Sequence, residues 1–229
     1  MTTRQKTTSA TALDRKPRDE ELDVYGLTHV GKVRAVNQDH FLICSLSKHL
    51  QVHLTSLPEV GRLPVGAERL AFLAMVADGV GGGVKGEEAS RIAVEAVTQY
   101  VTRTMHCYFA ADQTDEQDFS PALEAAALQC HADIVGQAEE NPDRRGMATT
   151  LTLWLGVWPR AYLLQVGDSR CYLLRDGELT QISRDQTMAQ ELIDQGILTR
   201  TDASTMKWSN VLSSSIGGGQ TAPVVTRLD

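Results

Sequence analysis

An uninterrupted apolar run, residues 70–77, is followed at once by Asp78 and then by five glycines within residues 79–86. Such a run is typical of a strand buried on both faces, and we expect it to end at Asp78 in a glycine-rich turn. A helix is expected to open at Glu87 and Glu88, because acidic side chains suit the positive end of the helix dipole. The apolar stripe of this helix has helical spacing and comprises Ala89, Ile92, Ala93, Ala96, Val97, Tyr100 and Val101.

The segment before this run predicts two short strands, residues 24–30 and 39–45, joined by a connection that begins at Gly31. Residues 47–68 hold two prolines and two glycines without a clear period, and we interpret them as a loop. Residues 1–23 contain few apolar side chains and are expected to form a mobile N-terminal tail. The alternative is a docking segment that becomes ordered on a partner.

The rest of the chain predicts a helix followed by strands. Ser120 and Pro121 suit the N-cap and first position of a helix that Asn141 and Pro142 end. β-prone segments predict strands at residues 151–157, 161–166 and 171–174, with a hairpin-like turn at 167–170. A helix at 187–195 that closes at Gly196, a short helix after Thr199 and a last strand within 217–229 complete the series. Strands joined by tight turns, with helices covering a sheet face, indicate an α+β fold with antiparallel sheets.

Composition excludes several classes of protein. The chain has 229 residues, of which 42% are hydrophobic and 22% are charged, as in ordinary globular proteins. No apolar stretch approaches the roughly 18 residues that cross a bilayer, and no apolar leader opens the sequence. The net charge is −7 without a basic block, so we expect neither a nucleic-acid nor a membrane partner. The four cysteines, Cys44, Cys107, Cys130 and Cys171, lack metal-binding spacing and are expected to be reduced, which suits a cytoplasmic protein.

Three carboxylates are expected where a strand gives way to a turn: Asp39, Asp78 and Asp168. Clustered carboxylates repel one another unless a cation neutralises them, and oxygen ligands favour hard ions such as Mg²⁺ or Mn²⁺. The alternative for each aspartate is an ordinary turn residue beside glycine. Arg34 is a further candidate, because a guanidinium suits phosphate recognition, although a loop arginine is more often a solvated charge.

The glycine run offers a competing interpretation. Residues 81–86 fit the G-x-G-x-x-G pattern between a strand and a helix, and Asp112 lies further on, as in dinucleotide-binding folds. Against it, Asp78 would lie where the phosphates approach, and no regular βαβ alternation follows. The plain alternative for the glycines is a tight turn that lets the backbone approach a neighbouring element.

Five segments together resemble the metal-dependent Ser/Thr protein phosphatases, the PPM family of type 2C. They are residues 31–39 (GKVRAVNQD, where the family has G-x-V-R-x-x-N-E-D), 76–82 (VADGVGG, V-A-D-G-M-G-G), 146–150 (GMATT, G-M-G-T-T), 167–170 (GDSR, unchanged) and 210–217 (NVL followed by IG, N-V-L-T-x-x-L-G). Their order matches the family's. The resemblance implies a single phosphatase domain, residues 24–229, with two stacked antiparallel β-sheets flanked by helices, an α-β-β-α sandwich.

The resemblance also implies a reaction. Two Mn²⁺ or Mg²⁺ ions, with a third weaker one, would activate a water that attacks the phosphorus of phosphoserine or phosphothreonine. Asp78 would bridge the two ions, the Gly79 carbonyl and Asp39 would serve the second ion, and Asp168 would serve the third. Arg34 would bind the substrate phosphate. The partner implied is a phosphorylated protein that a Ser/Thr kinase modifies.

Departures from the family pattern are informative. Gln38 replaces a glutamate, although its amide oxygen can still contact the second ion or hold a water. Gln186 stands where the family often has a histidine, at the start of a flap expected over residues 185–217, so a proposed proton donor is absent. Nothing after Gly219 matches the family's closing S-D-G and D-N-x-T segments, which supply two carboxylates to the first metal.

Three hypotheses follow. We favour the N-terminal part of a PPM-type phosphatase, with a domain incomplete at its C-terminus and little or no activity in the 229-residue chain itself. The second hypothesis is an inactive pseudophosphatase that binds a phosphoprotein or a kinase through Arg34. The third is the nucleotide-binding enzyme suggested by residues 81–86.

Overall fold

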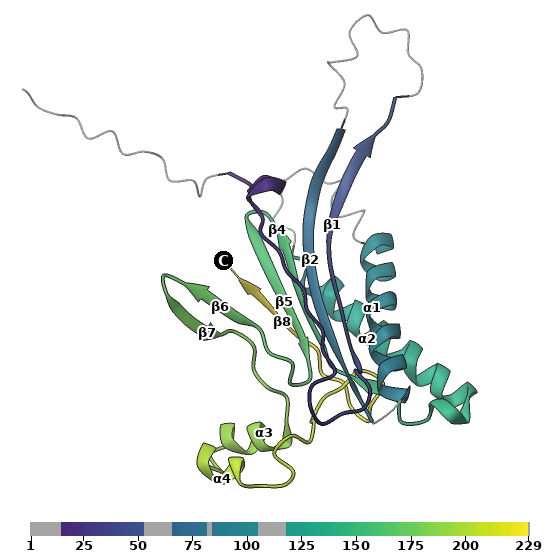
Figure 1. Cartoon of the computed structure of the whole chain (residues 1–229), viewed down its shortest axis with the longest axis vertical. Coiled ribbons are helices and arrows are strands. Elements are labelled where there is room, and N and C mark those ends of the chain that lie inside the picture. The colour runs from purple at the N-terminus through teal and green to yellow at the C-terminus, as the bar shows by residue number, and fades with distance from the viewer. Residues whose placement is uncertain (1–14, 53–65, 82–83, 105–117, 229) are drawn as a thin grey trace, which may run out of the picture.

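A six-stranded antiparallel sheet with two long helices on one face forms the body of the protein (Figure 1). The computed structural model describes residues 15–52, 66–81, 84–104 and 118–228. The strand order is β1-β2-β4-β5-β8, and β3 pairs with the end of β2. The strands are β1 (Asp39–Leu50), β2 (Gly66–Val80), β3 (Ala148–Thr149), β4 (Leu151–Val157), β5 (Arg160–Val166) and β8 (Val224–Leu228).

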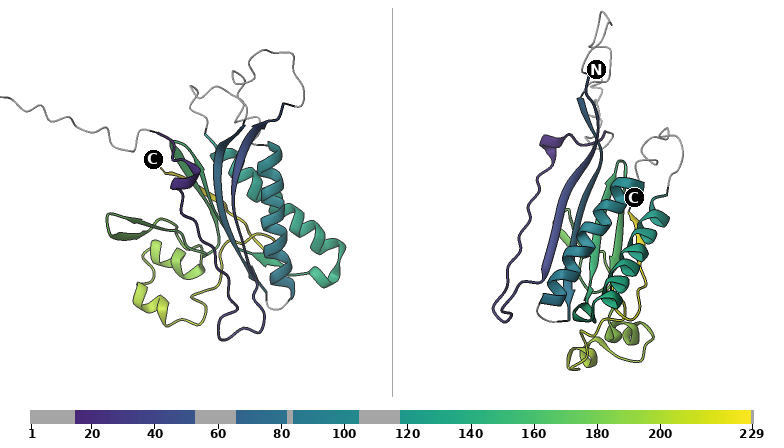
Figure 2. Two further views of the ribbon diagram at one scale, coloured as in Figure 1. Left: turned by 45° about the horizontal axis from the view of Figure 1, so that its top comes forward. Right: turned by 90° about the vertical axis from the view of Figure 1, so that its right-hand side faces the viewer.

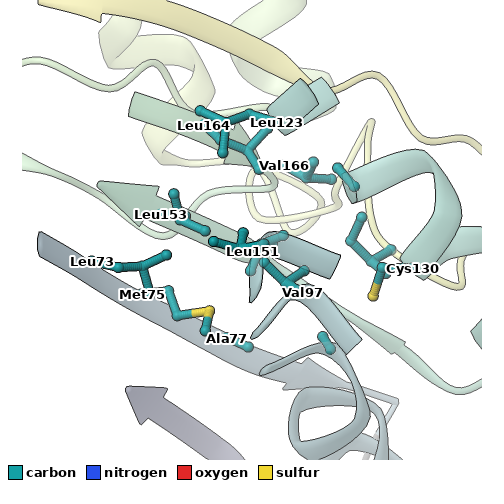
Figure 3. Packing of buried hydrophobic residues seen from close by; sticks show 14 of the residues in the cluster. Leu73, Met75, Ala77, Val97, Leu123, Cys130, Leu151, Leu153, Leu164 and Val166 are labelled. Atoms are coloured by element: carbon teal, nitrogen blue, oxygen red, sulfur yellow. The ribbon is translucent and has the colours of Figure 1, made fainter. Parts of the chain in front are cut away.

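The helices α1 (Val84–Thr104) and α2 (Ser120–Glu140) cover the same face of this sheet (Figure 2). Their apolar stripes meet inward-pointing side chains of the central strands, as Figure 3 shows for Met75, Leu153 and Val97. Met75 pairs with Leu153 across β2 and β4, and Leu153 pairs with Leu164 of β5, so one row of large side chains crosses the sheet under the helices. Because these residues are almost fully buried, they form the main hydrophobic core.

A second, smaller sheet consists of β6 (Tyr172–Arg175) and β7 (Glu178–Gln181). Asp176 and Gly177 join them with φ angles of 53° and 84°, as a two-residue hairpin turn requires. Beyond β7 lie two short helices, α3 (Met188–Asp194) and α4 (Arg200–Ser204), beside the lower end of the large sheet in Figure 1. The expected helices after residues 187 and 199 and the expected last strand are therefore confirmed, as is the α+β class with antiparallel sheets.

Several predicted boundaries were wrong. Residues 47–50 and 66–69 are not loop but extend β1 and β2, and β2 continues through Asp78 to Val80. The apolar run is not buried on both faces: Leu73 is buried, whereas Val76 on the opposite face is exposed, because α1 and α2 cover one side only. The helix opens at Val84 rather than Glu87. Gly82, Gly83, Cys107 and Asp112 lie outside the described residues.

Two predicted strand pairings also need correction. Residues 167–170 do not form a hairpin, because β5 belongs to the large sheet and β6 pairs only with β7. Residues 24–30 form no strand. They run over the face of the sheet opposite the helices, where Gly26 packs against the ring of Phe41 (Figure 2). A backbone that crosses above a sheet in this way does not share its hydrogen-bond ladder.

The described part of the predicted tail, residues 15–23, contacts the large sheet through Arg69 of β2. The buried Arg69 pairs with Asp19 at 3.2 Å and donates to the carbonyl of Pro17, while Lys16 donates to the carbonyl of Arg69. Of the remaining sequence predictions, Cys44, Cys130 and Cys171 are free thiols. Within the described residues, no helix has the length and apolar character needed to cross a membrane.

Candidate metal centre

Two carboxylates face each other at one end of the large sheet. Asp39 is the first residue of β1, and Asp78 is its partner across the β1–β2 ladder. Partial loss of hydration, together with the charge of Asp39 and a hydrogen bond to it, raises the pKa of Asp78 to about 6. Asp168 raises this pKa further, while the nearby Arg34 lowers it. The charge of Asp39 therefore disfavours the charged form of Asp78, as expected for an unneutralised neighbour of the same sign.

The backbone around Asp78 is fixed by two threonines that follow Gly146. The hydroxyl of Thr150 accepts from the Asp78 N–H at 3.0 Å, and the hydroxyl of Thr149 donates to the Asp78 carbonyl at 2.9 Å. Thr149 also exchanges backbone hydrogen bonds of 2.9 and 2.8 Å with Ile216. Three of the segments singled out in the sequence thus converge at the end of β2, and both threonines are buried.

The segment of Gln38 and Asp39 is held by the second turn of α1. The buried Ser90 donates to the Gln38 carbonyl at 2.6 Å, and the same carbonyl accepts from the Gly79 N–H at 3.1 Å. The ring of His40 lies 2.9 Å from the Ser90 hydroxyl. On the solvent side, Arg34 donates to the Gln38 side-chain oxygen at 3.3 Å, which keeps the guanidinium beside the carboxylate pair.

Close approach of the backbone explains two of the glycines. A Cβ on Gly79 would overlap the backbone of Gly86, and a Cβ on Gly86 would reach the side chain of Gln38. The start of α1 therefore packs directly on the end of β2, with no room for a side chain between them. This packing confirms, at Gly79 and Gly86, the interpretation of the glycines as a tight turn that lets the backbone approach a neighbouring element. The dinucleotide interpretation was wrong, because every pair of described strands is antiparallel and no parallel βαβ unit is present among them.

Asp168 projects from a loop whose backbone is tightly held. Gly167 has a φ angle of 98°, and its N–H donates to the side-chain oxygen of the buried Gln186 at 2.8 Å. Next to it, Ser169 bonds the Thr150 hydroxyl at 2.7 Å, which connects this loop to the end of β2. Loss of hydration raises the pKa of Asp168, and the charge of Asp185 acts in the same direction.

Gln186, which stands where the family often has a histidine, has a structural role. The Gln186 side chain is buried and bonds Gly167 and the carbonyl of Ala222 at 3.0 Å, so it lies behind the Asp168 loop rather than beside a leaving group. Its backbone carbonyl accepts a hydrogen bond from the Ser213 N–H at 3.0 Å, which joins the two ends of the segment that contains α3 and α4. The predicted flap, residues 185–217, thus joins the body of the protein at Gln186.

The donor set fits a hard divalent cation. The carboxylates of Asp39 and Asp78 belong to residues that are partners across the ladder, and Gln38 and Gly79, which offer neutral oxygens, are their neighbours in the chain. Asp39, Asp78 and Asp168 form no ion pair with any residue that the structure describes. Within the same residues, no three His, Cys, Asp or Glu side chains are close enough to enclose an ion. One or two carboxylates with water completing the shell are typical of Mg²⁺ sites. The pair therefore suits an ion that keeps most of its water.

Comparison with known proteins decides the family. The family model described as protein phosphatase 2C matches residues 65–210, well over half of the chain. The chain belongs to the protein phosphatase 2C family. It is 36% identical over 156 residues to the serine/threonine protein phosphatase PstP of Mycobacterium tuberculosis, which covers 68% of this chain and 28% of PstP. It is 30% identical over 145 residues to the serine/threonine phosphatase stp of Listeria monocytogenes, covering 63% of this chain and 55% of that protein. The chain thus spans between a quarter and somewhat over half the length of these relatives.

Solved structures of serine/threonine phosphatases share the fold. The crystal structure of PstP from M. tuberculosis superposes with a TM-score of 0.63 at 32% identity, covering 88% of this chain and 71% of that one. The catalytic domain of PstP in complex with two manganese ions superposes with a TM-score of 0.60 at 32% identity. The match covers 88% of this chain and 70% of that one. A serine/threonine phosphatase of S. agalactiae, at 23% identity and a TM-score of 0.66, supports the fold alone.

The structure brings some of the predicted site residues together and adds others. Asp39, Asp78, Gly79, Gln38 and Arg34 lie at one end of β1 and β2, and Asp168 lies on the adjoining loop. Their roles as ligands stay predictions. Sequence reasoning gave no role to the buried polar residues that hold them, namely Ser90, Thr149 and Thr150. A buried polar side chain next to a motif is the relevant signal, and burial is not visible in the sequence.

Proposed function

We propose that this chain forms the metal-bearing part of a protein serine/threonine phosphatase that uses Mn²⁺ or Mg²⁺ to hydrolyse phosphoserine and phosphothreonine. The observation that carries the proposal is the Asp39–Asp78 pair at the end of β1 and β2, in a chain of the protein phosphatase 2C family. The manganese-bound structure of PstP supports the choice of metal. The partners proposed are phosphoproteins that a Ser/Thr kinase has modified.

When bound, the divalent ions would supply a water of lowered pKa and would neutralise the phosphoryl oxygens. Asp39 and Asp78 would hold the ions, with the Gly79 carbonyl and the Gln38 amide as neutral oxygen ligands and Asp168 at the edge of the site.

Arg34 would orient the substrate. Its exposed guanidinium has several N–H donors, which suit bidentate binding of phosphoryl oxygens. The hydrogen bond from Arg34 to Gln38 keeps the guanidinium on the metal side of the loop, so a phosphate bound there would lie against Asp39 and Asp78. Positioning of this kind places the reacting atoms at attack distance.

Metal binding by this chain is the first test. Calorimetric titration with MnCl₂ should give saturable binding to the wild type and weaker binding to Asp78→Asn. The expected loss is more than about 100-fold, since even outer partners of metal ligands cost 10–100-fold when removed. Asp133→Asn removes the same charge from the outer surface of α2 and should bind as the wild type does. Equal affinities of Asp78→Asn and wild type would overturn the proposed site.

Turnover is the second test and uses the complete gene product, because the activity proposed belongs to the whole protein. Release of inorganic phosphate from a phosphothreonine peptide should require Mn²⁺ or Mg²⁺, and Asp78→Asn should abolish it. Arg34→Lys keeps the charge but loses the two-pronged donor geometry, so we expect a higher KM for the peptide with metal affinity unchanged. Metal binding without any turnover would support the inactive, phosphoprotein-binding alternative instead.

A further inference from the structure

A large polar cavity adjoins the candidate metal centre on the side of the flap. Its volume is about 1020 Å³, and it lies between the segment that follows β7 and the helices α3 and α4. Asp168 lies on its border, so the cavity continues directly from the site. Ligand pockets usually measure about 300–1,000 Å³, and a cavity of this size accommodates several residues of an extended peptide.

Three guanidinium groups and two carboxylates, those of Asp168 and Asp185, line this cavity, so cations outnumber anions there although the chain as a whole carries a net charge of −7. Arg170 forms an ion pair with Asp185 and donates to it through Nε at 2.9 Å. Arg184 forms an ion pair with Asp194. Arg200 projects from α4, is exposed, and makes no hydrogen bond or ion pair with any residue that the structure describes. A cation with free hydrogen-bond donors in a polar cavity favours an anionic ligand.

The position of Arg200 relates this charge to the proposed reaction. Asp168 is close enough to Asp78 for its charge to raise the pKa of Asp78, and Asp168 also lines the cavity that contains Arg200. A polypeptide whose phosphoresidue is at the metal centre would extend past Asp168 into the cavity. Arg200 interacts with Asp194 only through charge, so a carboxylate of such a peptide would meet Arg200 without displacing a hydrogen-bonded partner. Arg170 and Arg184 already form ion pairs.

We propose that this cavity is a specificity subsite that binds a second anionic group of the substrate polypeptide, close in sequence to the phosphoresidue. Arg200 is its anchor, and Arg184 adds to the positive charge. The anionic group is either the carboxylate of Asp or Glu or a second phosphate, since both present the same paired oxygen geometry to a guanidinium. The inference deepens the proposed phosphatase function and rests on it for the identity of the peptide.

Peptide binding tests the subsite separately from catalysis. Fluorescein-labelled phosphothreonine peptides are titrated with this chain and MnCl₂, and anisotropy is measured. Two glutamates, a second phosphothreonine or two glutamines flank the phosphoresidue, on its N-terminal side in one set and on its C-terminal side in another. In at least one set, the anionic peptides should bind about tenfold more tightly than the glutamine peptide, as one charge-assisted hydrogen-bond pair provides.

The gain should disappear in Arg200→Gln and fall in Arg184→Gln. Arg91→Gln is the matched control, because it removes one positive charge from α1, where Arg91 pairs with Glu95. A gain that persists in Arg200→Gln, or equal binding of anionic and glutamine peptides in both sets, would overturn the subsite. A gain for the second phosphate alone, or for glutamate alone, would identify the source of the anion. In the complete gene product, turnover of p-nitrophenyl phosphate, which has no flanking residues, should be the same in Arg200→Gln and wild type, and its absence in both would count against the phosphatase function rather than the subsite.

Discussion

Asp39 and Asp78 are direct partners across β1 and β2, at the end of the sheet where the loops gather. Like charges placed directly opposite each other in an antiparallel pair destabilise it, and here partial loss of hydration adds to the effect. The repulsion is an internal cost of the metal-free protein that a bound cation removes. Stability and metal binding are therefore coupled through one residue pair.

The first prediction concerns this coupling. Asp78→Asn should raise the melting temperature of the metal-free protein by about 3 °C, which corresponds to about 1 kcal/mol for a chain of this size. The wild type should gain stability on addition of MnCl₂, because a ligand of the folded state alone stabilises it, and the variant should not. Differential scanning fluorimetry with and without EDTA measures both effects. A lower melting temperature for metal-free Asp78→Asn would refute the repulsion argument.

The second prediction is a pair of glycine substitutions with opposite signs. Gly79→Ala should lower the free energy of unfolding by about 1–3 kcal/mol, the usual range for overpacking, because its Cβ would overlap the backbone of Gly86. Gly136→Ala should raise it by about 0.5–1 kcal/mol, because Gly136 lies inside α2 with open space around it. Urea denaturation of the two variants gives the comparison. Equal changes in the free energy of unfolding would contradict the tight packing of the end of β2 on the start of α1.

The sequence predicted the residues of the site better than the surrounding structure that holds them in place. Asp78, Asp39 and Arg34 follow from short motifs, because a motif records a local chain geometry together with its chemistry. The apolar run at residues 70–77 correctly indicated a strand, but its second face is exposed at Val76, since hydrophobicity alone does not say how many layers cover a sheet. The strand predicted at residues 24–30 was wrong for a related reason. Strand propensity depends on a pairing partner, and this segment crosses over Phe41 instead of pairing.

Long-range polar contacts were beyond sequence reasoning. Thr150 bonds both Asp78 and Ser169, which are 72 and 19 residues away from it along the chain. No local period or propensity records such a connection, because each side chain by itself is compatible with a surface position. The same holds for Gln186, for which the sequence indicated only that a histidine is absent, and whose contacts with Gly167 and Ala222 are structural.

The third prediction tests that structural role of Gln186. Gln186→Leu has a similar volume but leaves the Gly167 N–H and the Ala222 carbonyl without their partners. An unsatisfied buried group costs about 1–3 kcal/mol, so the free energy of unfolding should fall by about 2–4 kcal/mol. Gln190→Leu is the control, because Gln190 bonds Asp194 on the surface of α3 and its loss should cost under about 0.5 kcal/mol. Should both variants have the same free energy of unfolding in urea, the Gln186 side chain would not be what holds the loop of Asp168 in place.

The last prediction concerns Ser90, which lies behind the metal centre and touches no ligand atom of it. Its hydroxyl donates to the Gln38 carbonyl, so Ser90→Ala should loosen the turn that presents Gln38 and Asp39. We expect a loss of about 1 kcal/mol in unfolding free energy, and a loss of about tenfold in Mn²⁺ affinity, as for other supporting partners of metal ligands. Thr98→Val is a matched control, since the Thr98 hydroxyl bonds only the Val94 carbonyl within α1, remote from β1. Calorimetry with MnCl₂ and urea denaturation separate the two effects. A Ser90→Ala protein that loses stability but keeps full Mn²⁺ affinity would limit Ser90 to packing, whereas restored affinity in Ser90→Thr, which keeps the hydroxyl, would support its positioning role.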